Sequence, residues 1–516
     1  MYYAKNPILP GFCPDPSICR VGEDYYLVVS SFAYFPGVPV FHSKDLAHWE
    51  QIGNALERTS QLPLAGCGHS QGIYAPTIRY YDGTFYMITT NVSAGGNFIV
   101  TATNPAGPWS EPYFLGEDAQ GIDPSLFFDD DGSCYYIGTR PNQKGVRYNG
   151  DWEIWIQKMD LSAMALVGSS HKVWKGAGHH VIWPEGPHLY KKDGYYYLMH
   201  AEGGTADNHA VAIARSRDIW GTYEGCPNNP ILTHRHLGTE YPITAVGHGD
   251  LVADENDNWY MVMLGSRRCE GHVNTGRDTY LAKVTWENGW PVVNKGVGKL
   301  EELVELPGEA VYSMPEGRSW HFYRDDLPKC FMTLRGRKDV YRLMPSEGRL
   351  RLYAVEDCLT DCGTPAYVAV RQQDYEYRMA ALMEFTQGTD KEEAGIAVLC
   401  DEKNHMRLVK CYENGEPEVL LMLCEKGEER VVARQKVSEG RLELNMVCHG
   451  QKSDWYVTQE DGDSIGLASG VDMRMLSTEC TGGFTGCTLG MYASANGKKG
   501  ENHADFFWFS CEGIQE

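Results

Sequence analysis

Five copies of one pattern occupy residues 15–262 of this 516-residue chain. Each copy has a short polar or proline-containing start, a few apolar residues, a turn of Asp, Gly or Asn, and an aromatic-rich strand. The copies begin at Asp15, Ala75, Asp123, Glu185 and His248. This turn chemistry between aromatic and β-branched flanks is typical of β-hairpins. A repeated hairpin restricts the chain to a small number of repeat architectures.

A second pattern follows some of the copies and supplies the outer part of the same unit. It reads Ser-Lys-Asp-Leu at residues 43–46 and Ser-Arg-Asp-Ile at residues 216–219. Each unit then holds about four strands, and the units are roughly 50–65 residues apart, as in propeller blades. We therefore predict a five-bladed β-propeller over residues 1–295. A β-sandwich with coincidental hairpins is the alternative that the shared internal order of the copies disfavours.

The repeat stops near residue 295. Residues 296–324 are rich in glycine and proline, and we interpret them as a linker lying over the first domain. From residue 325 to 516 short alternating strands return without a helical period, which predicts a β-sandwich. The fold class is therefore all-β, a five-bladed propeller followed by a sandwich.

Charge and cysteine usage exclude several classes of function. The formal net charge of −23 disfavours nucleic acid and anionic membrane surfaces as partners. The N-terminus shows no signal peptide, and no stretch is apolar for long enough to span a bilayer. The 16 cysteines are scattered without a CxxC pair, which favours reduced thiols over a disulfide framework or zinc site. We expect a cytoplasmic protein with a neutral substrate.

Three of the repeats begin with a carboxylate, namely Asp15, Asp123 and Glu185. The first strand of a propeller blade lines the central channel, so these groups should converge at one end of it. Each aspartate alone could simply cap a turn. Converging carboxylates, however, repel one another and lose solvation, which is unfavourable unless the protein uses them.

Hydrolysis of a glycosidic bond requires paired carboxyl groups of this kind. Glu185 has the longest side chain and aromatic neighbours that could raise its pKa, so we assign it as the general acid. Asp15 is then the general base. Asp123 would orient Glu185 and keep its pKa high through like-charge proximity.

At these residues the chain resembles glycoside hydrolase family 43, in the branch of β-xylosidases and α-L-arabinofuranosidases with a C-terminal sandwich. The likeness covers nearly the whole chain. The matching segments are residues 6–9, 11–17, 34–39, 42–46, 72–76, 121–125, 184–187 and 276–279, and in the second domain residues 484–486, 490–493 and 505–509.

The resemblance implies an inverting mechanism with Asp15 as base, Asp123 as pKa modulator and Glu185 as acid. It also implies a concanavalin-like sandwich. Substrate-binding residues carried over from the family are Phe32, Tyr74, His248 and Arg277. No cofactor is required, although a structural calcium ion near His248 is an alternative to a metal-free histidine. A homo-oligomer is also implied by the family alone.

The predicted function is an exo-acting hydrolase that releases xylose or arabinose from small oligosaccharides of xylan or arabinan. Two alternatives stay open, an endo-arabinanase and a non-catalytic carbohydrate-binding protein. The sequence around residues 325–350 differs most from the family branch. It leaves open whether sandwich loops reach the pocket rim and close the channel into a pocket suited to exo action.

Overall fold

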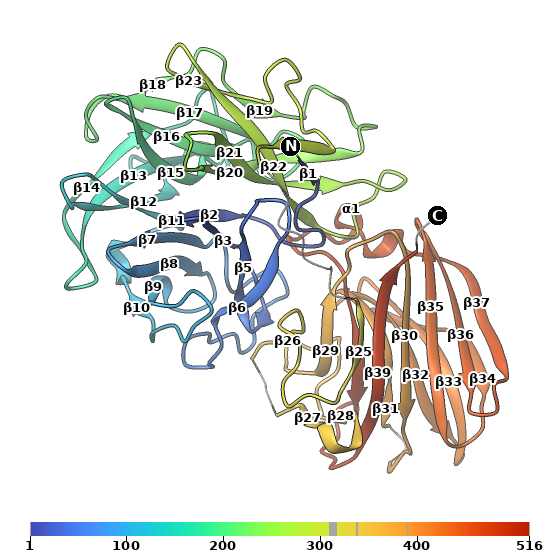
Figure 1. The fold of residues 1–516 in the computed structure, drawn as a ribbon. Helices are drawn as coiled ribbons and strands as arrows, with labels where there is room; N and C mark the ends of the chain where they lie inside the picture. Colours follow the sequence, from blue (N-terminus) through green and yellow to red (C-terminus); the bar gives the residue numbers. More distant parts are fainter. Residues whose placement is uncertain (1, 309–316, 337–338, 390, 515–516) are drawn as a thin grey trace.

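The structure, a computed structural model, describes residues 2–308, 317–336, 339–389 and 391–514. Figure 1 shows two bodies, an N-terminal one in blue to green and a C-terminal one in yellow to red. Both are built from β-strands, so the all-β prediction of a propeller followed by a sandwich is confirmed. Within the described residues, no helix has the length and apolar character needed to cross a membrane.

Each of the five repeats forms one sheet from strands that follow one another in the chain. The first two sheets contain β2 (Ser17–Val21), β3 (Asp24–Val28), β5 (Gly37–Ser43) and β6 (Glu50–Leu56), then β7 (Thr77–Tyr81), β8 (Thr84–Asn91), β9 (Gly96–Ala102) and β10 (Tyr113–Phe114). The third contains β11 (Ile122–Phe128), β12 (Cys134–Pro141), β13 (Trp152–Asp160) and β14 (Ala165–Trp174).

The last two sheets of the propeller follow the same plan. The fourth contains β15 (Glu185–Lys192), β16 (Tyr195–Glu202), β17 (Ala210–Ser216) and β18 (Glu224–Gly225), with β19 (Leu232–Thr233) also on β17. The fifth contains β20 (Ile243–Ala253), β21 (Trp259–Arg267), β22 (Arg277–Glu287) and β23 (Trp290–Val293). The first strands contact one another in the order β2, β7, β11, β15 and β20, and β20 contacts β2, which closes the ring.

A buried ion pair joins the two inner strands that flank β2 in this ring. Arg79 Nη1 on β7 donates to Asp250 Oδ2 on β20 at 2.8 Å, and Ser17 Oγ on β2 donates to the same oxygen at 2.7 Å. From β15, Tyr190 donates to Asp250 Oδ1 at 2.5 Å, and His188 Nδ1 lies 2.9 Å from Arg79 Nη2. Asp250 is fully buried, so this network supplies the charge compensation that the channel needs.

The segment predicted as a linker is partly tied to the propeller. β24 (Leu303–Leu306) pairs antiparallel with β1 (Tyr2–Lys5) at the N-terminus. The Asn6 side-chain amide donates to the carbonyls of Leu281 and Glu301, both at 2.8 Å. The chain start, the fifth sheet and the linker are therefore joined at one point. Residues 309–316 of the predicted linker lie outside the described residues.

The second domain packs two antiparallel sheets face to face. One contains β27 (Tyr341–Met344), β28 (Arg349–Tyr353), β39 (His503–Gly513), β30 (Glu376–Glu384), β35 (Arg441–His449), β36 (Lys452–Gln459) and β37 (Ser464–Asp472), with β25 (Ser319–His321) also on β39. The other contains β29 (Ala366–Arg371), β38 (Thr488–Ser494), β31 (Glu393–Asp401), β32 (Asn404–Glu413), β33 (Glu416–Glu425) and β34 (Glu428–Lys436).

The six-stranded sheet is apolar on both faces. One face forms the core of the sandwich, and the other packs against the propeller. Tyr367, Leu399 and Tyr492 from this second face cluster with Phe12 and Phe32 of the propeller. A short pairing between β4 (Tyr34–Phe35) and β26 (Thr333–Leu334) adds backbone hydrogen bonds between the domains. The sandwich is therefore held in a fixed position beside the propeller.

Replacing Asp250 with Ala should lower the free energy of unfolding by about 3–5 kcal/mol, because it leaves the Arg79 charge buried without its partner. Urea unfolding followed by tryptophan fluorescence measures this. The exposed pair between Lys192 and Asp257 provides the control, since Asp257→Asn should cost only about 0–1 kcal/mol. Equal effects of the two substitutions would contradict the central role of the Arg79–Asp250 pair.

Candidate active site

Four of the inner strands have a residue in the left-handed backbone region, either close to their start or, in β20, within the strand. The φ angles are 55° at Asp15, 53° at Asp123, 56° at Gly186 and 47° at His248. Asp and His are among the non-glycine residues that adopt this region most readily, and Gly adopts it freely. The register of β11, β15 and β20 shifts close to these positions. Such bulges turn side chains away from the regular alternation of a strand.

Glu185 does not occupy the position equivalent to Asp15 and Asp123, which corrects the sequence alignment of the repeats. Gly186 takes the left-handed position, and Glu185 comes one residue earlier. The physical reason is space. A side chain on Gly186 would meet the His248 ring, whose Nε2 atom lies 2.7 Å from an ideal Cβ. The longer glutamate side chain therefore comes from the neighbouring residue.

Asp15 is buried and bonded through both carboxylate oxygens. Arg277 Nη1 donates to Oδ1 at 2.9 Å, and Ser30 Oγ donates to Oδ2 at 2.6 Å. His248 Nδ1 lies 3.6 Å from Oδ1. Burial alone would raise the pKa of Asp15, but the charges of Arg277 and His248 and the Ser30 hydrogen bond outweigh it and hold the pKa below its usual value. Asp15 is therefore ionised at neutral pH.

Asp123 and Glu185 shift in the opposite direction. Burial raises the pKa of Asp123 to about 6; the negative charge of Asp15 adds to this shift, and the charge of His248 opposes it. Part of the Glu185 side chain stays exposed, yet lost solvation is the largest cause that raises its pKa well above the usual value. The charges of Asp123 and Asp15 raise it further. The structure thus brings all three predicted carboxylates into one electrostatic group, in which the pKa of Asp15 is lowered and those of Asp123 and Glu185 are raised.

Three aromatic rings lie beside these carboxylates. Phe32 and Tyr74, both predicted as pocket walls, have ring centroids 5.6 Å apart in an edge-to-face arrangement. The third ring, Phe484, comes from the sandwich and lies 6.2 Å from Phe32 and 5.8 Å from Tyr74. The question left open by the sequence is therefore answered, because a loop of the second domain does reach the site.

Arg277, predicted as a substrate-binding residue, connects the carboxylates to this aromatic wall. Its guanidinium lies over the Phe32 and Phe484 rings at 5.9 and 5.6 Å. Its Nη2 donates to the Phe484 carbonyl at 3.2 Å, and its Nη1 also reaches Thr205 Oγ1 at 3.2 Å. Arg277 Nε is buried without a hydrogen-bond partner among the described residues. That N–H is a donor in a site otherwise rich in acceptors.

His248 is buried between the two aspartates and Gly186. The residues around it do not fit a calcium ion, which takes six to eight oxygen ligands. The carboxylates that face His248 are already engaged, Asp15 with Arg277 and Ser30, and Asp123 with the Gly186 backbone N–H at 3.1 Å. His248 therefore fits better as part of the electrostatic group than as a metal ligand.

Four residues of this site were not predicted from the sequence: Ser30, Thr205, His209 and Phe484. Ser30, Thr205 and His209 lie in connecting segments or later strands of the sheets, where the repeat carries no polar signal. His209 Nδ1 lies 2.9 Å from the Ala245 carbonyl, beside the His248 segment. Phe484 lies in the segment 484–486, which resembles the family, and this resemblance was the only signal for it in the sequence. The segment does not show that the Phe484 ring contacts residues of the propeller.

With this geometry in place, comparison with known proteins identifies the class. Residues 4–291 match the family described as glycosyl hydrolases family 43. Residues 319–512 match a beta xylosidase C-terminal concanavalin A-like domain. The chain belongs to glycoside hydrolase family 43 and is a glycosidase.

Proteins similar over their full length carry related names. A xylosidase/arabinosidase from Butyrivibrio fibrisolvens is 52% identical and covers 100% of both chains. A non-reducing end alpha-L-arabinofuranosidase from Bacteroides ovatus is 39% identical over 98% of this chain and 94% of that one. Among solved structures, a xylan beta-1,4-xylosidase from Bacillus halodurans superposes with a TM-score of 0.92 at 33% identity, over 99% of this chain and 100% of the other.

Replacing Asp123 with Asn should move the alkaline limb of the kcat/KM profile to lower pH. Ionised Asp123 raises the pKa of Glu185, so a neutral amide lowers that pKa and Glu185 loses its proton earlier as the pH rises. The profile is measured with an aryl glycoside. The exposed Asp131→Asn change on the same sheet should leave the limb in place, whereas an unchanged limb in Asp123→Asn would contradict the coupling.

Replacing Gly486 with Ala should displace the Phe484 loop, because an added Cβ would lie 2.3 Å from the Thr275 backbone. Burial of a phenylalanine ring is worth about 1.5–3 kcal/mol, so losing it from the pocket should raise KM roughly tenfold or more. Gly466→Ala is the matched control, since a Cβ added there would meet nothing within 4 Å. Equal KM values for both variants would show that the loop does not form the pocket wall.

Proposed function

We propose that this glycosidase is an exo-acting, inverting enzyme that releases xylose or arabinose from the ends or side chains of small xylan- or arabinan-derived oligosaccharides. One observation carries the proposal. Asp15 and Glu185 belong to one electrostatic group, yet their surroundings shift their pKa values in opposite directions. Because the two pKa values are shifted apart, Asp15 can act as a base and Glu185 as an acid at the same pH.

In the proposed reaction Asp15 accepts a proton from a water molecule as the water oxygen attacks the anomeric carbon. Glu185 gives its proton to the glycosidic oxygen as the bond between that oxygen and the anomeric carbon breaks. The free sugar thus leaves with inverted configuration, and the two carboxyl groups have exchanged protonation states. Asp123 acts as a positioning residue that keeps Glu185 protonated through its negative charge.

The aromatic wall, which includes one ring from the sandwich, supports exo action on a small sugar. Phe32, Tyr74 and Phe484 offer apolar surfaces that suit the C–H face of a sugar ring. Arg277, carried over from the family as a substrate-binding residue, lies between Asp15 and this aromatic wall. The names of the relatives support pentoses, since they include both xylosidase and arabinofuranosidase.

We further propose that the enzyme works in a reducing compartment on short imported oligosaccharides. All 16 cysteines are free thiols, and ten of them are buried. A cytoplasmic location explains why so many thiols persist without forming disulfides.

The Glu185→Gln variant tests the proposed acid. Wild type should release 4-nitrophenol from the β-D-xylopyranoside, the α-L-arabinofuranoside or both, and the ratio of the two kcat/KM values identifies the preferred sugar. The variant should lose about 10²–10⁴-fold in kcat on unactivated oligosaccharides, because no group remains to protonate the leaving oxygen. Stopped assays with chromatography of the released sugars give both rates and products.

Glu224→Gln, an exposed carboxylate of the same sheet, is the control and should keep wild-type rates. Full activity of Glu185→Gln would contradict the mechanism. Wild-type release of mixed-length products instead of monosaccharide would show an endo-acting enzyme. Sugar binding without any product would show a carbohydrate-binding protein.

A further inference from the structure

Three residues with metal-binding side chains lie in a row across the six-stranded sheet of the sandwich. His405 on β32 pairs in register with Cys424 on β33, and Cys424 pairs with Glu429 on β34. Directly paired residues point to the same face of a sheet. Their ligand atoms all lie within 4.8 Å of one another. The row is remote in sequence from the catalytic carboxylates and takes no part in the proposed reaction.

His405 is the residue that a packing role does not explain. Its side chain is fully buried, and neither ring nitrogen has a hydrogen-bond partner among the described residues. A buried polar group without a partner costs free energy, so such a group in a native structure points to a missing water or ion. Nε2 of His405 lies 3.8 Å from Glu429 Oε1, which is too long for a hydrogen bond.

The same separation suits two ligands of one metal ion. Ligand distances of about 2.0–2.3 Å in tetrahedral geometry place neighbouring ligand atoms roughly 3.3–3.8 Å apart. Cys424 is buried, and its thiol donates only a 3.4 Å contact to the Lys403 carbonyl. Glu429 is exposed, so a metal ion can enter from that side; its Oε1 atom also accepts a hydrogen bond from Arg407.

The surrounding charges favour a divalent cation. Arg407 donates to Glu393 at 2.9 Å and to Glu429 at 2.5 Å, which leaves one excess negative charge among these three side chains. Ionised Cys424 would add a second negative charge, and a divalent ion would neutralise both. Imidazole, thiolate and carboxylate together are a donor set that suits Zn²⁺, whereas Ca²⁺ and Mg²⁺ prefer oxygen alone.

We propose that the sandwich domain binds one Zn²⁺ ion through His405, Cys424 and Glu429, with water as the fourth ligand. The ion joins three adjacent strands near the open edge of the sheet. Binding displaces the thiol proton of Cys424 into solvent, so affinity rises with pH.

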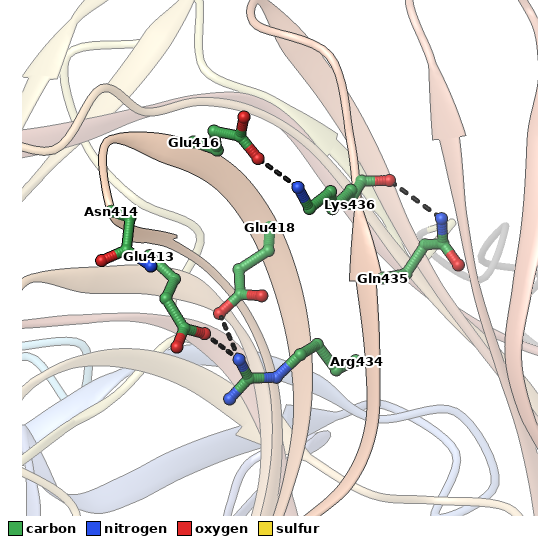
Figure 2. Close-up of a pocket in the computed structure, with 7 residues that line it drawn as sticks. All are labelled: Glu413, Asn414, Glu416, Glu418, Arg434, Gln435 and Lys436. Carbon is green, nitrogen blue, oxygen red and sulfur yellow. Dashed lines mark hydrogen bonds and ion pairs between the residues drawn. The ribbon is translucent and has the colours of Figure 1, made fainter.

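The other end of the same three strands shows how this sheet arranges acidic groups without a metal. Figure 2 shows Arg434 with Glu413 and Glu418, and Lys436 with Glu416, so each of these carboxylates has a cation beside it. At the end that contains His405, Glu429 likewise has Arg407 beside it, but neither ring nitrogen of His405 has a hydrogen-bond partner in the described part of the chain. The unsatisfied histidine is what distinguishes this end of the strands.

Cobalt(II) titration of the metal-stripped full chain tests the proposal, because Co²⁺ bound to a thiolate gives a near-ultraviolet charge-transfer band. Wild type should develop this band up to about one equivalent and lose it on addition of Zn²⁺. Cys424→Ser should lack the band, whereas Cys411→Ser, which removes a thiol from the neighbouring strand β32, should keep it. Zn²⁺ should also raise the Tm of wild type by more than that of Cys424→Ser.

If Cys424→Ser fails to fold, Glu429→Gln tests the metal site instead. Residue 429 is exposed, so this substitution should leave the fold intact. This variant should bind Co²⁺ at least about tenfold more weakly, the loss that even an outer partner of a metal ligand can cause. Absence of the band in wild type would overturn the proposal. An equal band and affinity in the variants would overturn it too, because other thiols would then be the ligands.

Discussion

The ion pair between Arg277 and Asp15 determines how the site divides its charge. Three carboxyl groups, Asp15, Asp123 and Glu185, influence one another in a largely buried space, so they cannot all ionise readily. The charge of Arg277 lowers the pKa of all three, but among them only Asp15 accepts its hydrogen bond, and Asp15 also accepts one from Ser30. Burial and the Asp15 charge then raise the pKa of the other two, that of Asp123 to about 6 and that of Glu185 well above its usual value. One cation beside one carboxylate therefore separates the base from the acid.

The propeller provides the backbone that makes this arrangement possible. Its inner strands form a closed ring, and left-handed residues on or just before these strands direct side chains toward a common space. The Arg79–Asp250 pair compensates the buried charge within the ring. The sandwich contributes Phe484 and a hydrogen-bond acceptor for Arg277, so the same arginine also contacts the second domain. The Arg277 side chain thus stabilises the charge of Asp15 and also contacts the second domain.

The sequence was informative where a local pattern decides the structure. Five repeats predicted the propeller, and the short alternating strands after residue 325 predicted the sandwich. Positions set by contacts between distant segments could not be read from the sequence. Two features of the site depend on such contacts. One is that Gly186, rather than Glu185, takes the left-handed position. The other is the contact of Phe484 with the propeller.

Infrared difference spectroscopy of the carboxyl groups tests the division of charge most directly. At pH 7 the spectrum of wild type minus Glu185→Gln should contain the C=O stretch of a protonated carboxylic acid, because burial and the neighbouring carboxylates raise the pKa of Glu185. The spectrum of wild type minus Asp15→Asn should instead contain carboxylate bands. A carboxylate signal from Glu185, or a protonated signal from Asp15, would contradict the account.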